Sequence, residues 1–217
     1  MCQKELIMEK NTLQKFDILA LLHEFSQHEL QLTVYRNTDI HFLHEVLQIL
    51  EKITEFIERQ NDVFSLNDIL SVERIRELYI HKANIYLHFN TYEKALEAYQ
   101  KAKSYISKEE KDDKLHWLKC MDGISWVKAR MELYEDALKD CNELISYAFQ
   151  KDALLPKFFT VRACCYKELG QTLLSERDFE IAKCNPLQIK MVLQKLGDYS
   201  LPNGFTIEGY ILFKRLF

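Results

Sequence analysis

Small and large residues alternate at helical spacing in two matching segments of this chain. Residues 92–105 read YEKALEAYQKAKSY, and residues 134–147 read YEDALKDCNELISY, 42 positions later (134 minus 92). Residues three and four apart share one face of a helix, which places Ala95, Tyr99 and Ala102 together. Alanines let a neighbouring helix come close while tyrosines fill the space beside them. The pattern therefore predicts antiparallel helices packed at short distance.

A matching face precedes the first segment and returns after the second. Tyr79, Ala83 and Tyr86 follow one another at intervals of four and three, and residues 88–91, HFNT, supply a turn before residue 92. A looser copy covers residues 158–186. In it Ala163 and Tyr166 take the positions of Ala83 and Tyr86, and Gly170 marks the turn. Phe179 and Ala182 take the positions of Tyr99 and Ala102.

This pattern resembles the tetratricopeptide repeat (TPR), a helix-turn-helix unit of about 34 residues with the signature W-x2-L-G-x2-Y, then A-x3-F, then P. The first copy places Tyr79, Ala83, Tyr86, Ala95 and Tyr99 at five of the six signature positions before the proline. The second departs from it, with Ser125, Lys128 and Cys141 at the small, Tyr and Phe positions. The resemblance implies an all-α, right-handed superhelical solenoid of antiparallel helix hairpins that binds other proteins.

The rest of the chain flanks these copies. Residues 1–70 carry apolar residues at helical spacing and predict an N-terminal helical hairpin; whether it is a degenerate repeat stays open. Thr38 or Asp39 is expected to cap its second helix, and Ser71 the helix after it. Residues 71–186 hold three TPR-like repeats. Residues 187–217 hold a C-terminal capping helix, near 187–196, and an apolar tail.

The tail, residues 203–217, reads NGFTIEGYILFKRLF and is too apolar for a solvated terminus. We expect it to pack on the solenoid as an integral part. The alternatives are a segment that binds a partner or forms a dimer, and a disordered end. The sequence does not give the oligomeric state.

Composition favours long helices and excludes other classes of protein. With 47% hydrophobic residues the 217-residue chain can bury a core, whereas 5 Gly and 3 Pro lie far below the usual frequencies of about 7% and 5%. A formal charge of −4 without a basic stripe argues against nucleic acid. The charged N-terminus excludes a signal peptide, and no apolar run of about 18 residues exists to enter a membrane. Six cysteines without a C-x-x-C pair are typical of free thiols in a reducing compartment, so we expect a cytoplasmic protein.

Residues that could carry chemistry are few. The zinc motif H-E-x-x-H has two histidines four residues apart, whereas His23 and His28, with Glu24 after the first, are five apart. This spacing puts the two imidazoles roughly 140° apart on a helix. His41 and His44 share a face without a clear acidic partner. Neither Cys164 nor Cys165 has an assignable base. We therefore expect no catalytic residue, no metal and no cofactor.

In the family that the repeats resemble, the first helix of each repeat lines a concave groove that holds a partner's peptide or helix. Projected onto this sequence, the groove comprises residues about four apart: Glu77, Ile80, Asn84, Leu87, Lys119, Asp122, Trp126, Arg130, Lys157, Thr160, Cys164 and Lys167. The leading hypothesis is a non-enzymatic interaction module, an adaptor or chaperone-like scaffold, for a segment with acidic and apolar side chains. The alternative is an intracellular regulatory peptide receptor of the long-repeat TPR type; an unrecognised enzyme is the third hypothesis. Trp126 either anchors the ligand or only packs inside the protein.

Overall fold

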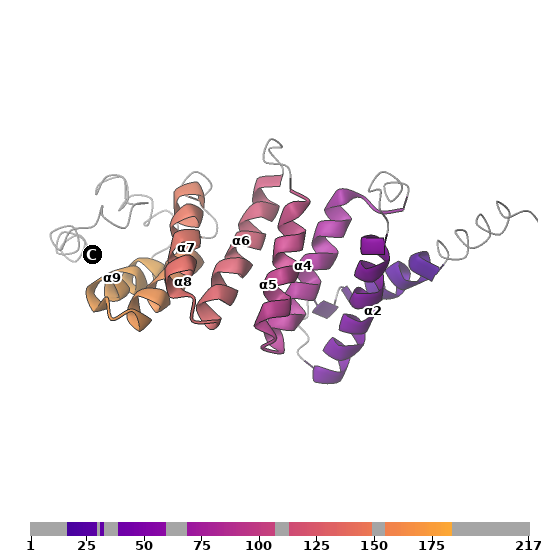
Figure 1. Cartoon of the computed structure of the whole chain (residues 1–217), viewed down its shortest axis with the longest axis horizontal. Coiled ribbons are helices and arrows are strands. Elements are labelled where there is room, and N and C mark those ends of the chain that lie inside the picture. Colours follow the sequence, from indigo (N-terminus) through magenta and orange to yellow (C-terminus); the bar gives the residue numbers. More distant parts are fainter. Residues whose placement is uncertain are drawn as a thin grey trace, which may run out of the picture.

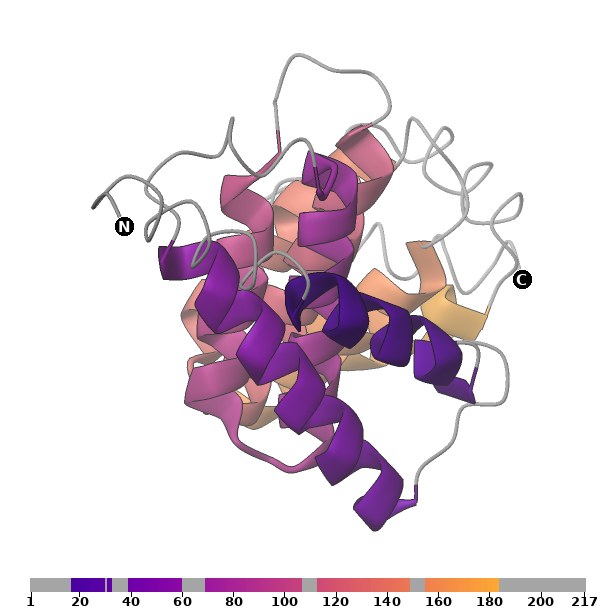
Figure 2. The ribbon, with the colours of Figure 1, turned by 90° about the vertical axis from the view of Figure 1, so that its right-hand side faces the viewer.

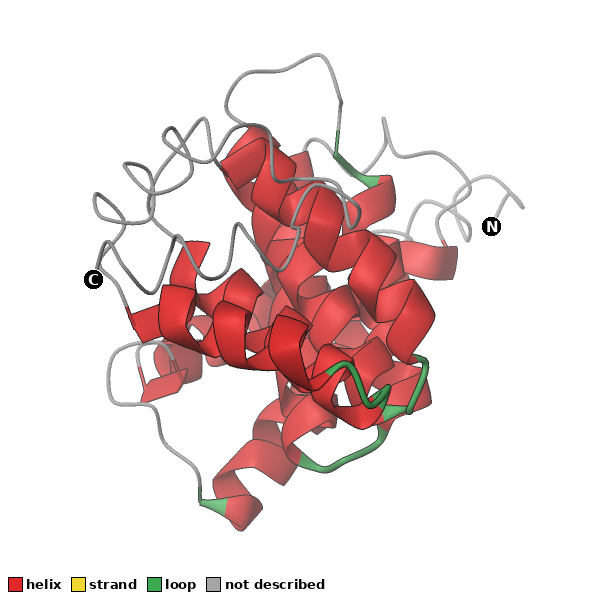
Figure 3. Cartoon of the chain, turned by 90° about the vertical axis from the view of Figure 1, so that its left-hand side faces the viewer, coloured by secondary structure: helices red, strands yellow, loops and turns green. Residues whose placement is uncertain are grey.

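A computed structural model describes residues 17–29, 31–32, 39–59, 69–106, 113–148 and 155–183. All regular structure in these ranges is helical, which confirms the all-α prediction (Figures 1 and 3). Residues 17–29 form a helix. The helices after it are α2 (Ile40–Arg59), α4 (Val72–His88), α5 (Tyr92–Ser104), α6 (Asp113–Arg130), α7 (Tyr134–Ala148), α8 (Leu155–Glu168) and α9 (Thr172–Lys183). The predicted capping helix and apolar tail lie outside the described residues.

Local sequence signals fix where several helices begin. The Ser71 side chain accepts a hydrogen bond from the backbone N–H of Arg74 at 3.2 Å, which caps α4 as predicted. Asp39 Oδ1 accepts one from the backbone N–H of Phe42 at 2.9 Å and caps α2. The other predicted candidate for that cap, Thr38, lies outside the described residues.

The turns after α4, α6 and α8 share one geometry. Each contains a residue with positive φ: Asn90 at 56°, Glu132 at 63° and Gly170 at 71°. The backbone N–H that follows each of these residues donates to a carbonyl five residues back, as in Thr91 to Tyr86 at 3.0 Å. This pattern ends a helix with a left-handed residue and satisfies its last carbonyls. Three helix pairs, α4–α5, α6–α7 and α8–α9, therefore reverse direction in the same way.

The helices lie side by side in chain order, and from α4 onwards each packs on the next (Figure 1). The first helices of the three pairs also contact one another, α4 with α6 and α6 with α8. The second helices make no comparable contacts between pairs. The first helices of the pairs, α4, α6 and α8, therefore lie closer to one another than the second helices do.

The small and large residues of the segment at 92–105 and of its neighbouring helices meet inside this packing. Ala83, Ala95 and Ala102 are fully buried and Tyr99 is 3% exposed. Gly123 on α6 receives the Tyr99 ring, because a Cβ at Gly123 would lie only 2.3 Å from a ring carbon. The sequence had suggested Ser125 as the small residue of this copy; Ser125 is buried too, but Gly123 makes the space for the ring.

The helix at residues 17–29 contacts both α2 and α4 (Figure 2). Ile18 and Phe25 are buried, so its apolar face belongs to the core. Arg74 on α4 holds the last turn of this helix through two hydrogen bonds to Glu29, at 2.7 and 2.9 Å. Within the described residues, no helix is long and apolar enough to cross a lipid bilayer.

Candidate binding groove

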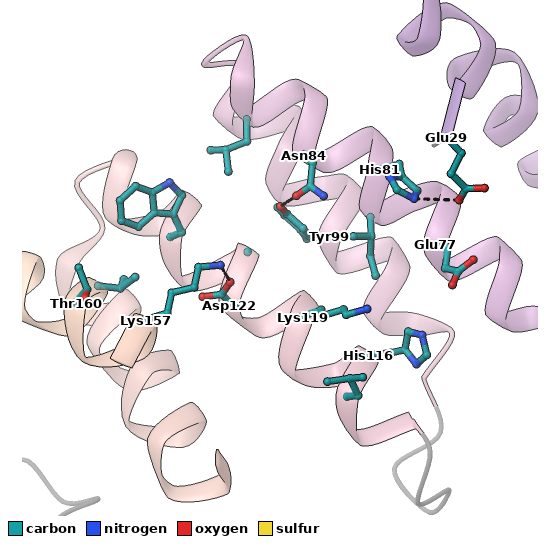
Figure 4. Close-up of a pocket in the computed structure, with 16 residues that line it drawn as sticks. Glu29, Glu77, His81, Asn84, Tyr99, His116, Lys119, Asp122, Lys157 and Thr160 are labelled. Carbon is teal, nitrogen blue, oxygen red and sulfur yellow. Dashed lines mark hydrogen bonds and ion pairs between the residues drawn. The ribbon is translucent and has the colours of Figure 1, made fainter. Parts of the chain in front are cut away.

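A pocket of about 870 Å³ opens on the side formed by α4, α6 and α8 (Figure 4). Nine of the twelve residues projected from the sequence line it: Glu77, Ile80, Asn84, Leu87, Lys119, Asp122, Trp126, Lys157 and Thr160. The structure thus brings these residues together in one concave site; that they bind a partner stays a prediction.

Three projected residues are not part of this lining: Arg130, Cys164 and Lys167. Arg130 donates to the Tyr92 hydroxyl at 3.1 and 3.2 Å, and its guanidinium lies over the Tyr92 ring. Lys167 lies in the last turn of α8. The projection from the sequence extended the groove to the end of each first helix. In the structure, the Arg130 side chain at the end of α6 instead contacts Tyr92 of α5.

The Asn84 amide is held in a fixed orientation. The Tyr99 hydroxyl donates a short hydrogen bond to Asn84 Oδ1, and both residues line the pocket (Figure 4). Burial of Tyr99 raises the pKa of its hydroxyl well above the usual range, so the hydroxyl remains a donor. With Oδ1 occupied, the Nδ2 group of Asn84 is the part of the side chain that can donate to a ligand.

Asp122 and Lys157 form an ion pair across the groove, from α6 to α8. The Asp122 side chain is 12% exposed and that of Lys157 is 60% exposed. Burial raises the pKa of the Asp122 carboxyl, an effect that Lys157 opposes without reversing. The Oδ1 atom of Asp122 is buried without a hydrogen-bond partner among the described residues. Lys157 is therefore the group that compensates the charge of the Asp122 carboxylate. Because the Lys157 ammonium is exposed to water, this ion pair contributes little to stability.

Lys119 is the cation without a counter-ion in this groove. It is exposed on α6, and among the described residues it has no ion-pair partner. In Figure 4 its ammonium group points toward the side of Glu77 and His81 and away from Lys157 and Thr160. The half-buried Trp126 lies on the same helix, and Ile80 and Leu87 line the pocket from α4.

At the acidic end of the groove, Arg74 pairs with two carboxylates, those of Glu29 and Glu77. Burial tends to raise the pKa of Glu29, but the Arg74 guanidinium outweighs this and holds that pKa below its usual value. Arg74 also contacts Glu77 at 3.2 Å. Burial lowers the pKa of His81, which lies 3.3 Å from Glu29, so this imidazole is neutral at pH 7. Each of these two carboxylates has Arg74 as an ion-pair partner, whereas Lys119 has no ion-pair partner among the described residues.

Sequence reasoning missed seven lining residues: Glu29, His81, Tyr99, Leu115, His116, Gly123 and Val161. Leu115 and His116 lie four and three residues before Lys119 and could have been found by extending the projection one helical turn. Tyr99 was assigned to packing alone. Glu29 reaches the groove from a helix 45 residues before Arg74, and no local signal marks that contact.

The thiols of the described residues are unsuited to nucleophilic chemistry. Burial raises the pKa of Cys120 to about 12 and that of Cys165 to about 11. Burial also raises the pKa values of Cys141 and Cys164. Since the thiolate is the reactive form, these groups are protonated and unreactive at neutral pH.

The chain matches no protein-family model, no curated protein and no solved structure. The groove geometry and the internal pattern of the chain are therefore the basis for a functional proposal.

Proposed function

We propose that this protein is a non-enzymatic interaction module of the TPR type, an adaptor or chaperone-like scaffold. Its ligand is an extended segment of a partner protein that lies in the groove formed by α4, α6 and α8. The proposal includes a right-handed superhelical arrangement of the helix pairs. It is supported by the three equivalent turns and by the contacts of α4 with α6 and of α6 with α8.

The ligand that fits this groove carries an acidic side chain beside a large apolar or aromatic one. Lys119 supplies the charge for the acid, and the fixed Asn84 amide can donate to the ligand backbone or to the same carboxylate. Trp126, Ile80 and Leu87 supply apolar area. Tryptophan is among the residues where binding energy concentrates at protein interfaces.

The observation that carries this proposal is the ammonium of Lys119, which has no ion-pair partner among the described residues, in a groove whose other charged groups are paired. A basic segment would face that ammonium, and the carboxylates of the groove already pair with Arg74 and Lys157. Charge complementarity therefore favours an acidic ligand.

The test is a peptide-display selection with the full chain and with the Lys119→Glu variant. We expect the wild type to enrich peptides in which Asp or Glu lies near an aromatic or branched apolar residue. The variant should instead enrich peptides with Lys or Arg at the acidic position. Lys167→Glu, on α8 but outside the pocket lining, is the matched control and should select the same peptides as the wild type.

Two results would contradict the proposal: the absence of enriched peptides, and enrichment of the same peptides by wild type and Lys119→Glu. Affinities of the selected peptides, measured by fluorescence anisotropy at two salt concentrations, should weaken as salt rises because the Lys119 contact is solvent-accessible.

A regulatory peptide receptor is the second candidate, and the position of Glu29 favours it. Glu29 lines the groove while it binds Arg74, so a ligand carboxylate that replaced Glu29 on Arg74 would release the helix at residues 17–29. Hydrogen exchange separates the two functions. A receptor should lose protection in residues 17–29 when a selected peptide binds, whereas a passive adaptor should not.

A further inference from the structure

Away from the groove, the structure brings three potential metal ligands together at the contact between the N-terminal helix and α2. The ligand atoms of Glu24, His28 and Glu45 all lie within 4.8 Å of one another. We propose that these three side chains bind a divalent transition-metal ion, for which Zn²⁺ is the best fit, and that the ion links the helix at residues 17–29 to α2.

The residues come from two motifs that the sequence did not connect. Glu24 and His28 are four residues apart, so they share a face of one helix. Glu45 follows His44, whose ring stacks on Phe89 at 4.4 Å and so belongs to a different contact. The cluster that forms is therefore neither of the two histidine pairs noted in the sequence. It consists of one histidine and two glutamates.

Electrostatics favour a cation at this position. Neither Glu24 nor Glu45 has an ion-pair partner among the described residues, and the two carboxylates face each other across a helix contact. Like charges at this separation repel, and a divalent ion would neutralise both. The His28 ring is held edge-on against Phe42, with centroids 5.4 Å apart, so its orientation is already restricted.

The donor set selects the kind of metal. One imidazole nitrogen and two carboxylate oxygens suit Zn²⁺, whereas Mg²⁺ and Ca²⁺ prefer oxygen ligands alone. In a tetrahedral zinc site, bonds of about 2.1 Å place ligand atoms about 3.4 Å apart. Glu24 and Glu45 are exposed, so rotamer changes can close the remaining distance, and the fourth position is available to water.

Metal binding would act on the groove indirectly. His28 precedes Glu29, the residue through which this helix contacts Arg74 and lines the pocket.

A ligand that binds the folded chain and not the unfolded one stabilises the folded state by mass action. Zn²⁺ should therefore raise the melting temperature.

The experiment is a calorimetric titration of the full, chelator-treated chain with ZnCl₂, repeated on single variants. We expect equimolar binding to the wild type, with affinity at least about tenfold weaker in Glu24→Gln, Glu45→Gln and His28→Ala, because loss of a supporting residue alone already weakens metal sites by 10–100-fold. His23→Ala, on the same helix and exposed, should bind like the wild type. The two glutamate variants alter exposed side chains, so circular dichroism should show them folded.

Absence of Zn²⁺ binding to the wild type would overturn the proposal. Binding of equal strength in the wild type and the three ligand variants would overturn it as well, since the ion would then be held elsewhere, for example by cysteines. Loss of binding in the three variants, together with a zinc-dependent rise in melting temperature that only they lose, would support it.

Discussion

The first and last of the three helix pairs follow the same steric plan but compensate their polar groups differently. In α4–α5, Ala83 is fully buried and Tyr86 is 7% exposed; in α8–α9, Ala163 and Tyr166 occupy the same positions with 0% and 3% exposure. Both pairs turn through a left-handed residue. The repeated small and large residues thus accompany the same turn geometry in both pairs.

The polar partners of the two pairs have nothing in common. On α4, the Tyr79 hydroxyl donates to Glu58 at 2.9 Å and the Tyr86 hydroxyl to Glu51 at 2.6 Å, both acceptors being on α2. On α8, the guanidinium of Arg162 donates to Asp178 of α9 at 2.6 and 3.2 Å. That ion pair is 2% and 0% exposed, whereas the glutamates on α2 remain accessible to water.

The difference follows from what each helix packs against. Helix α4 has α2 beside it, whose glutamates can accept from tyrosine. Helix α8 instead buries a guanidinium against α9 and α7, with Asn142 accepting a further hydrogen bond from Arg162 at 2.7 Å. A buried charge without its partner is far more costly than an unpaired group that water can reach. The α8–α9 pair should therefore be the more sensitive to loss of a polar group.

The largest expected effect is that of Asp178→Ala. Removing this carboxylate leaves the buried Arg162 without its counter-ion, so the free energy of unfolding should fall by about 3–5 kcal/mol. Urea denaturation followed by circular dichroism measures the change. Glu180→Gln, an exchange on the same helix in a more exposed position, serves as the control. A loss below about 1 kcal/mol for Asp178→Ala would remove the proposed contrast between the two pairs.

Gly123→Ala tests the steric half of the comparison. The added Cβ would meet ring carbons of Tyr99 at 2.3 to 2.7 Å, so ring or helix must move, at an expected loss of about 1–3 kcal/mol. The same substitution should cost much less in a Tyr99→Ala background, since the ring is then absent. Additive losses in this double-mutant cycle would show that the ring contact does not limit the helix spacing.

Tyr79→Phe and Tyr86→Phe test the polar partners of α4. Each removes one hydrogen bond to a carboxylate while keeping the ring, so we expect losses of about 1 kcal/mol each. Denaturant titrations of both variants should place them well below Asp178→Ala. Losses as large as that of the aspartate variant would mean that the contacts of α4 with α2 are as demanding as the buried ion pair.

The smallest effect concerns pH and the more exposed ion pair of Arg74 with Glu29. The pKa of Glu29 is lowered in the folded state, so its contribution to stability is present above the unfolded value near 4.5 and is lost as pH falls through the lower folded value. Wild type should therefore lose more stability than Glu29→Gln as pH falls from 5 towards acid. Thermal melts at a series of pH values compare the two, and parallel curves would argue against this contribution.

Local sequence was sufficient for much of the helical framework. The start of α5 at Tyr92, the caps at Ser71 and Asp39 and the turn at Gly170 follow from spacing, capping and turn chemistry, which act within a few residues. The groove projection, which combined helical periodicity with the resemblance to the TPR family, also selected nine residues that line one pocket. The solenoid handedness and the binding function remain predictions.

The sequence by itself determined which residues form helices and which faces pack, because residues three and four apart share a face whatever lies beyond the helix. Only the tertiary structure decided that Glu29 reaches the groove, that Arg130 turns to Tyr92 and that Glu45 joins Glu24 and His28. These outcomes depend on which helices become neighbours and at what angle they meet. Packing between distant segments sets both, and no local interval in the chain records it.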